Sequence, residues 1–187
     1  MFAEQARRFA QDVPSLRPAV DFEGSKFVSK QQVLEVANKC LDQYAEARAE
    51  KFSDVLEYCL HNVQNVVRSR GYLQTKFKEP RTEQVENGSK IIVPVEEGAL
   101  YRIGEITVKE NKVFSSAQLL EMINLKTGDI ANGEALGTAL FETIKQTYGN
   151  LGYIQYTAEV EPDFHLKEGA PEGIVDLKIT IDEGLQV

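Results

Sequence analysis

The chain has 187 residues, of which 42% are hydrophobic and 27% are charged, and this is the composition of a folded globular protein. Its formal net charge of -8 opposes binding to a phosphate backbone or an anionic membrane surface, so we expect no nucleic-acid partner. No apolar run approaches the roughly 20 residues that a membrane-spanning helix needs.

The N-terminal half begins with an amphipathic segment, residues 1–18, which we interpret as a linker helix or the remnant of a preceding unit. A short alternating stretch starts at Val20, and Ser29 then stands where a helix N-cap is expected. Apolar residues at helical spacing predict two helices on either side of "EARAEK". Their stripes are Val33, Ala37, Cys40, Leu41 and Tyr44, and then Val55, Leu56, Cys59, Leu60, Val63, Val66 and Val67.

Gly71 stands where the second of these helices must stop, a position that favours a left-handed residue, and Tyr72 is expected to fold back onto the last turn. Alternation from residue 73 to 78 predicts a strand with one covered face. After the polar turn "VENGSK", the pattern of Ile91, Val93 and Val95 predicts another strand. Pro94 predicts a bulge or break within it, because proline lacks the amide that a central strand needs.

The C-terminal half repeats this order. Apolar and polar residues alternate over 106–108, and Ser115 stands at an N-cap position. Helices are predicted over 116–123 and near 132–149. Gly152 and Tyr153 are expected to end the second helix, and "IQYTAEVE" predicts a strand with Ile154, Tyr156, Ala158 and Val160 on its covered face. A last strand is predicted from its inward-pointing residues, which are Val175, Leu177, Ile179 and Ile181.

The two halves align without a gap over 20–36 and 106–122, an offset of 86 that also matches 91–98 with 177–184. Such self-similarity indicates tandem copies of one structural unit. We therefore predict an α+β fold of two β-α-α-β-β units, each a three-stranded sheet covered on one face by two helices. The expected domains are residues 19–100 and 101–187.

Both units resemble POTRA domains, and the second carries the resemblance best through "LYRIGEITVKENKVFSSAQLLEMINLKTGD", "YGNLGYIQYTAEVEP" and "VDLKITIDEG". The first unit matches through "VDFEGSKFVS", "VRSRGYLQTKFKEP" and "IIVPVEEG". The resemblance implies a periplasmic module of an outer-membrane protein assembly or translocation factor, with a C-terminal membrane β-barrel in the full-length protein. A two-unit extracytoplasmic adaptor for division or two-partner secretion is the alternative.

In this family the second strand of each unit lies at a sheet edge, where unpaired backbone groups can bind an extended peptide by β-augmentation. The expected partners are unfolded outer-membrane proteins or assembly-complex subunits. The alternative is that charges such as Lys76 and Glu159 only protect these edges from pairing. The predicted binding residues are Leu73, Gln74, Thr75, Lys76, Phe77, Lys78, Ile154, Gln155, Tyr156, Thr157, Ala158, Glu159 and Val160.

The segment "PVEEGALYRIGEI" is predicted to join the two units as a hinge, formed by Glu97, Gly98, Tyr101, Arg102 and Gly104. Gly104 is expected to permit the bend into the next strand. Two antiparallel helices joined near residue 50 would bring Cys40 and Cys59 face to face. A disulfide bond is then one alternative, which a periplasmic site would permit, and two buried free thiols are the other.

Catalysis has little support in the sequence. His61 falls within a helix pattern and His165 in a predicted loop, and neither has a ligand-spaced partner in sequence. The acidic pairs Glu96-Glu97 and Asp182-Glu183 are interpreted as solvated strand ends. We expect no enzyme activity and no cofactor.

Overall fold

The computed structural model describes residues 19–26, 30–45, 52–86 and 88–187. The chain divides by compactness into two units. The first contains residues up to Leu60 together with Phe77–Glu96, and the second contains His61–Lys76 together with Glu97–Val187. Among the described residues, no helix has the length and apolar character needed to cross a membrane.

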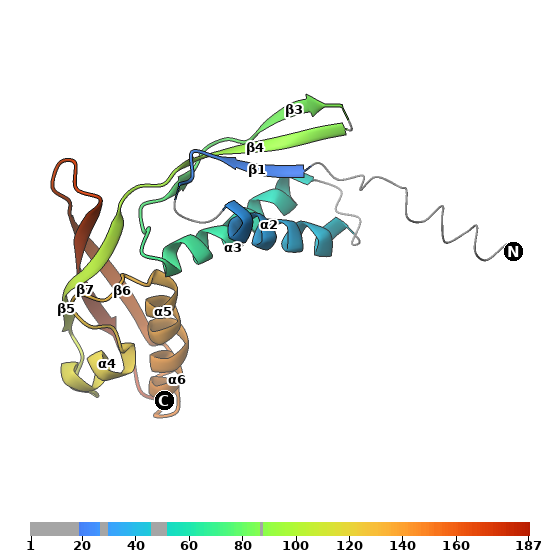
Figure 1. Ribbon diagram of the computed structural model, residues 1–187. Coiled ribbons are helices and arrows are strands. Elements are labelled where there is room, and N and C mark those ends of the chain that lie inside the picture. The colour runs from blue at the N-terminus through green and yellow to red at the C-terminus, as the bar shows by residue number, and fades with distance from the viewer. Residues whose placement is uncertain (1–18, 27–29, 46–51, 87) are drawn as a thin grey trace, which may run out of the picture. The chain divides into compact units, whose positions relative to one another are not determined.

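The first sheet is built around strand β4 (Gly88–Glu96). Strand β1 (Ala19–Glu23) pairs with it in parallel, and strands β2 (Lys76–Phe77) and β3 (Arg81–Val85) lie along its other side. β2 and β3 follow each other closely in sequence, so together they take the place of one edge strand. Figure 1 shows β4 lying between β1 and β3.

Helix α2 (Lys30–Ala45) and the start of helix α3 (Phe52–Ser69) cover one face of the first sheet (Figure 1). The predicted stripes provide the contact surface, because α2 buries Val33, Ala37 and Leu41. The predicted N-cap Ser29 lies outside the described residues. Both helices are amphipathic, and this explains why each is stable only against the sheet.

Strand β4 runs through Pro94 without a break, so the predicted interruption of this strand is wrong. The interruption falls instead on the neighbouring edge, between β2 and β3. Lys78 donates its backbone N–H to the Pro94 carbonyl at 2.9 Å. Because Pro94 has no N–H to return to this edge, the ladder is weakened locally and the edge strand splits in two.

The second sheet has the strand order β5-β7-β6 and contains strands β5 (Leu100–Lys109), β6 (Thr157–His165) and β7 (Glu172–Asp182). β7 is parallel to β5 and antiparallel to β6. Its residues alternate between buried and less buried, as expected for a central strand with one covered face. The inward residues are the predicted ones, Val175, Leu177, Ile179 and Ile181.

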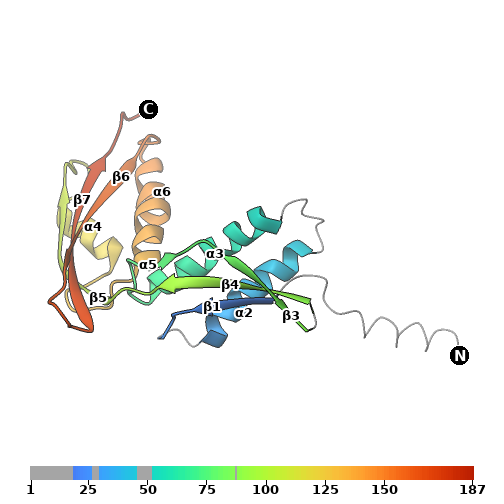
Figure 2. The ribbon, with the colours of Figure 1, turned by 90° about the horizontal axis from the view of Figure 1, so that it is seen from above.

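Helices α4 (Ser116–Ile123), α5 (Gly133–Thr138), the π-helical turn η1 (Ala139–Ile144) and α6 (Lys145–Gly149) cover one face of the second sheet, and α5, η1 and α6 form one continuous helical segment (Figure 2). Ser115 caps α4 as predicted, in a capping box with Gln118. The core beneath these helices includes Leu119, Leu140, Ile144 and Tyr148. The predicted α+β class with two tandem units is confirmed.

The two Gly-Tyr dipeptides end their helices in the same way. Gly71 and Gly152 have φ values of +88° and +90°, in the left-handed region. Tyr72 donates its N–H to Val67, and Tyr153 to Tyr148, so each turn is a Schellman motif. The predicted helix stops are therefore confirmed, and the turns leave the following residues in equivalent positions.

Candidate functional site at the sheet edges

Strand β6 forms one edge of the second sheet, since it pairs with β7 along its whole length and, in the part of the chain that the structure describes, no strand pairs with its other side. Its side chains alternate between the two faces. Ala158, Val160 and Phe164 are half-buried against the core, whereas Glu159 and Glu161 are exposed. The strand therefore offers a backbone edge between an apolar and an acidic surface.

The strand starts later than the sequence predicts. Ile154, Gln155 and Tyr156 form a turn in which Tyr156 donates its N–H to the Tyr153 carbonyl, and only Thr157 begins the pairing with β7. Ile154 is 65% exposed, so its predicted place on the covered face is wrong. The helix stop at Gly152 is followed by this tight turn, which uses up the residues that alternation alone assigns to the strand.

The predicted edge of the first unit also differs. Leu73, Gln74 and Thr75 form a turn, and of the predicted segment only Lys76 and Phe77 are paired as a strand. The Thr75 hydroxyl donates to the Tyr72 and Glu97 carbonyls, at 3.1 and 2.7 Å. These hydrogen bonds hold residues 73–75 in a turn, so the three residues do not form an extended edge.

The longer edge strand in the first unit is β3, which the sequence analysis missed. Its five residues are all exposed, including Val85 at 47%. The signal was the Asn87-Gly88 dipeptide, which favours a tight hairpin and so places a strand directly before it. β3 is held to β4 in antiparallel register, from Arg81 opposite Ile92 to Val85 opposite Gly88.

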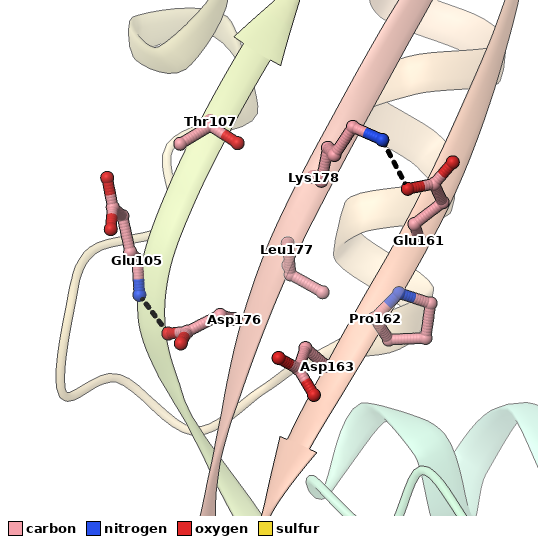
Figure 3. Close-up of a pocket in the computed structure, with 8 residues that line it drawn as sticks. All are labelled: Glu105, Thr107, Glu161, Pro162, Asp163, Asp176, Leu177 and Lys178. Carbon is pink, nitrogen blue, oxygen red and sulfur yellow. Dashed lines mark hydrogen bonds and ion pairs between the residues drawn. The ribbon is translucent and has the colours of Figure 1, made fainter.

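A hollow of about 410 Å³ lies on the face of the second sheet that is turned away from the helices (Figure 3). Its charged groups are four carboxylates and Lys178, whose hydrogen bond to Glu161 raises the pKa of the lysine. An acidic hollow beside an open strand edge complements polar and cationic side chains. The lining residues are Glu105, Thr107, Glu161, Pro162, Asp163, Asp176, Leu177 and Lys178.

His165 ends β6 instead of lying in a loop, which corrects the sequence prediction. Its Nε2 atom lies 3.0 Å from Asp176 Oδ2 and 3.4 Å from Asp163 Oδ2. Asp163 lies two residues earlier on β6, whereas Asp176 comes from the paired strand β7 and could not be found by sequence spacing. Within the described ranges, no group of three or more His, Cys, Asp or Glu side chains is arranged to hold a metal ion. His61 is exposed on α3.

The predicted hinge residues take specific positions within the second unit. Gly98 has a φ of +74°, and Tyr101 is buried with its hydroxyl donating to Gln74 Oε1 at 2.7 Å. Arg102 forms an exposed ion pair with Glu172, at 2.8 Å. Gln74, which is predicted to bind peptide at a sheet edge, uses its side chain to accept this hydrogen bond from a predicted hinge residue.

Gly104 lies in the irregular register of β5 between Ile103 and Ile106. A Cβ atom there would lie 2.0 Å from Asp176 Oδ1 and 2.6 Å from Ile174 Cγ2. The Asp176 carboxylate accepts the backbone N–H of Glu105 at 2.6 Å. Glycine is thus required at 104 because it leaves space for a carboxylate that satisfies the irregular strand.

Cys40 and Cys59 are joined by a disulfide bond between α2 and α3, with an S–S distance of 2.08 Å and a Cα–Cα distance of 5.6 Å. Both residues are buried, at 5% and 0% exposure. Of the two alternatives that the sequence left open, the structure contains the bridge. We predict that the protein in solution contains this bridge.

Glu183 corrects the interpretation of the acidic pair at the end of β7, because it is buried rather than solvated. Its Oε1 atom accepts the N–H groups of Lys112 and Val113 and the Tyr148 hydroxyl, at 2.7, 2.8 and 2.9 Å. Burial raises the pKa of Glu183, but the hydrogen bonds outweigh burial and hold it below its usual value. The pKa of Tyr148 is raised by burial and by the same carboxylate.

Tyr156 stacks on Tyr148, with ring centroids 4.8 Å apart, but its own hydroxyl is buried and has no hydrogen-bond partner among the described residues. Burial raises the pKa of Tyr156 to about 12. Thr75 holds the equivalent position in the first copy of the sequence repeat, and its shorter side chain reaches two carbonyls. The second unit therefore carries an unsatisfied polar atom in its core.

We expect Tyr156→Phe to stabilise the protein by about 1 kcal/mol, since it removes a buried hydroxyl without a partner. Tyr148→Phe is the matched control. It removes the same atom from a hydroxyl that donates to Glu183, and it is expected to destabilise by about 1 to 2 kcal/mol. Urea denaturation followed by far-UV circular dichroism measures both. A loss of stability in Tyr156→Phe would contradict the prediction.

Comparison with known proteins places this architecture. Residues 101–184 match the family model POTRA, described as surface antigen variable number repeat. The crystal structure of Haemophilus influenzae BamA POTRA3-5 superposes with a TM-score of 0.64 at 17% identity, covering 94% of this chain and 70% of that chain. BamA from Haemophilus ducreyi lacking POTRA domains 1-3 gives a TM-score of 0.55 at 16% identity, over 91% of this chain and 29% of that one.

At these identities the two structures show a shared fold, and the family model matches the sequence of most of the second unit. The matched region begins at Tyr101 in β5 and ends at Gly184, just beyond β7. It therefore contains all of the second sheet except the first residue of β5, together with the helices that cover it. The chain has the fold of tandem POTRA domains, and residues 101–184 match the POTRA family model.

Proposed function

We propose that this protein is the periplasmic, client-binding part of an outer-membrane protein assembly or translocation factor. Its domains are residues 19–100 and 101–187, joined through Glu97–Gly104. The relatives named BamA support the assembly role. A disulfide between Cys40 and Cys59 fits an oxidising compartment such as the periplasm.

The observation that carries the proposal is the open edge of β6. An unpaired edge presents N–H and C=O groups to an extended peptide, whose backbone then supplies most of the binding energy. β6 is nine residues long and pairs with β7 throughout, so it is a rigid template. β3 is the corresponding but shorter edge of the first unit.

The two faces of β6 favour a particular kind of segment. A strand added at this edge would place alternate side chains next to Ala158 and Val160 on one face, and next to Glu159 and Glu161 on the other. Segments that alternate between apolar and polar or basic residues match this pattern. Strands of outer-membrane proteins alternate in this way.

Pro162 indicates which backbone groups of β6 face outward. A proline within a paired strand is tolerated where its nitrogen faces away from the partner strand. Backbone groups alternate in direction along a strand. Val160 lies two residues before Pro162 and Ala158 lies four residues before it, so the backbone groups of all three residues face the same side. Ala158 and Val160 are therefore the residues whose N–H groups would bind a peptide.

We expect Ala158→Pro to weaken binding of an extended, alternating peptide by roughly fivefold, because it removes one outward donor worth about 1 kcal/mol. The β6–β7 ladder and the acidic face stay intact. The measurement is NMR titration of the full chain with a peptide of alternating valine and lysine, since shift changes along β6 give both the affinity and the site.

Glu159→Pro is the matched control, because its nitrogen faces β7 and the substitution breaks the native ladder. It should lower the melting temperature, whereas Ala158→Pro should change it much less. Peptide binding with unchanged affinity in folded Ala158→Pro would exclude this edge as the docking site. Shift changes confined to β3 would place binding on the first unit instead.

A further inference from the structure

The face of the first sheet that is turned away from the helices contains a buried apolar residue. On β1 and β4 the residues that face the helices, such as Phe22 and its partner Val93, are buried as expected. Ile92 lies on the other face, directly opposite Asp21 of β1 and Arg81 of β3. It is nevertheless only 6% exposed. Neighbouring side chains on the open face therefore cover an apolar residue of the central strand.

Arg81 provides part of this cover. Its guanidinium group donates to both carboxylate oxygens of Glu23, at 2.9 and 3.2 Å. Arg81 belongs to β3 and Glu23 to β1, and these strands lie on opposite sides of β4. The arginine side chain must therefore cross over β4, where its aliphatic part shields Ile92. The ion pair joins the two strands that flank β4.

Little burial holds β3 in the sheet. All five of its residues are exposed. The side chains of Arg81 and Glu23 are 45% and 59% exposed, so their ion pair adds little stability. Residues 79–80 separate β3 from β2, and Lys78 beside β2 keeps its own hydrogen bond to β4. β3 can therefore leave β4 without unpairing β2.

The sequence of β3 also fits poorly on the strand that it covers. Arg81 and Thr82 lie opposite the buried Ile92 and Ile91, so neither isoleucine has an apolar residue as its partner on β3. Side chains directly opposite each other in an antiparallel pair are the ones that interact most closely. A segment with two consecutive apolar residues at these positions would bury more apolar surface than β3 does.

We propose that an extended client segment with two consecutive apolar residues replaces β3 on β4, instead of adding to the outside of β3. The inference rests on the proposed function, since it takes the protein to bind extended segments. It deepens that proposal by giving the two units different selectivity. The fixed edge of β6 selects alternating segments, whereas β4 accepts segments with adjacent apolar residues once β3 has left.

Hydrogen exchange followed by NMR tests whether β3 leaves on its own. The Pro94 carbonyl accepts from Lys78, so it faces the side of β2 and β3. The amide of Ile92, two residues before Pro94, faces the same side, and the amide of Val93 faces β1. After correction for intrinsic rates, we expect the Ile92 amide to exchange roughly tenfold faster than the Val93 amide. Equal protection of the two amides would overturn the proposal.

Arg81→Gln removes the ion pair and should speed exchange of the Ile92 amide by roughly threefold, while the amides that face β1 stay unchanged. Lys78→Gln is the matched control, because it removes another exposed ion pair, with Glu96, that lies beside β2. It should leave the Ile92 amide unchanged, and Arg81→Glu combined with Glu23→Arg should restore protection. An unchanged rate in Arg81→Gln would mean that this contact does not hold β3, and the inference drawn from it would fail.

Two peptides test the replacement itself. One has the sequence of residues 79–86, and the other, the valine peptide, carries Arg81→Val and Thr82→Val in that sequence. In an NMR titration of the full chain, we expect the valine peptide to bind roughly tenfold more tightly. It should also move the β3 signals to the positions of an unstructured segment. Binding of the valine peptide while β3 stays paired with β4 would overturn the proposal, because the peptide would then add to the edge.

A variant with β3 fixed to β4 separates this inference from the proposed docking site on β6. Gln84→Cys/Ser89→Cys places two cysteines directly opposite each other, at a pair without ladder hydrogen bonds, where a disulfide can join them. The crosslink should abolish binding of the valine peptide, and unchanged binding would overturn the replacement. If the valine peptide displaces β3 in the unchanged protein while no peptide binds β6, this inference holds and the docking site on β6 fails.

Discussion

Glu183→Ala is expected to destabilise the second unit by about 3 kcal/mol, because it leaves the buried N–H groups of Lys112 and Val113 and the Tyr148 hydroxyl without their acceptor. The neighbouring Asp182→Ala is the control. Asp182 is exposed and accepts only a local N–H from Gly184 in the described contacts, so its loss should cost less than about 1 kcal/mol. Urea denaturation of each variant measures the difference.

The Glu183 carboxylate should also make the free energy of unfolding depend on pH in the acid range. The pKa of Glu183 is lower in the folded protein than in the unfolded chain, so the folded state favours the ionised form. Its contribution is present above about pH 5 and is lost as the pH falls through the folded pKa. In a plot of unfolding free energy against pH, Glu183→Gln should reduce the loss of stability below about pH 5. An unchanged loss would show that other carboxylates cause it.

Reduction of the bond between Cys40 and Cys59 is expected to lower the free energy of unfolding by about 3 kcal/mol. The bridge closes a loop with a sequence separation of 19 residues, and its loss lets the unfolded chain regain the entropy of that loop. Denaturation of the unchanged protein with and without reductant measures the effect without altering the sequence.

The double variant Cys40→Ala/Cys59→Ala supplies the control, because reductant should not change its stability. Alkylation of protein isolated from an oxidising compartment, followed by electrophoresis with and without reductant, reports whether the bridge forms. Two alkylated thiols in such protein would contradict the bridge. The unfolding midpoint would then be insensitive to reductant as well.

Local signals in the sequence predicted the elements that depend on few residues. Ser115 and Gln118 form their capping box within four residues, and helix α4 spans the predicted 116–123. Gly71 and Gly152 end their helices because a left-handed turn is decided by the glycine itself. The inward residues of β7 followed from period-two alternation, since the strand has one covered face.

The misassigned residues depend on partners that are distant in sequence. Glu183 looked solvated because its two backbone donors lie 71 and 70 residues earlier and its third donor, Tyr148, lies 35 residues earlier. Ile154 looked buried because alternation cannot detect a turn that precedes a strand. Of the candidate site, the edge at Thr157–Val160 was predicted. Arg81–Val85 was missed although the turn after it and strand β4 were predicted, because its exposed residues show no apolar alternation.

Pro162 near the middle of β6 also limits how strongly this edge can polymerise. Fibril growth by strand stacking needs an uninterrupted series of donors and acceptors from one chain to the next. A proline that faces outward removes one donor from the series, so an arriving strand is held by two short stretches on either side of the gap. We therefore expect that copies of the protein cannot stack through this edge into a continuous ladder.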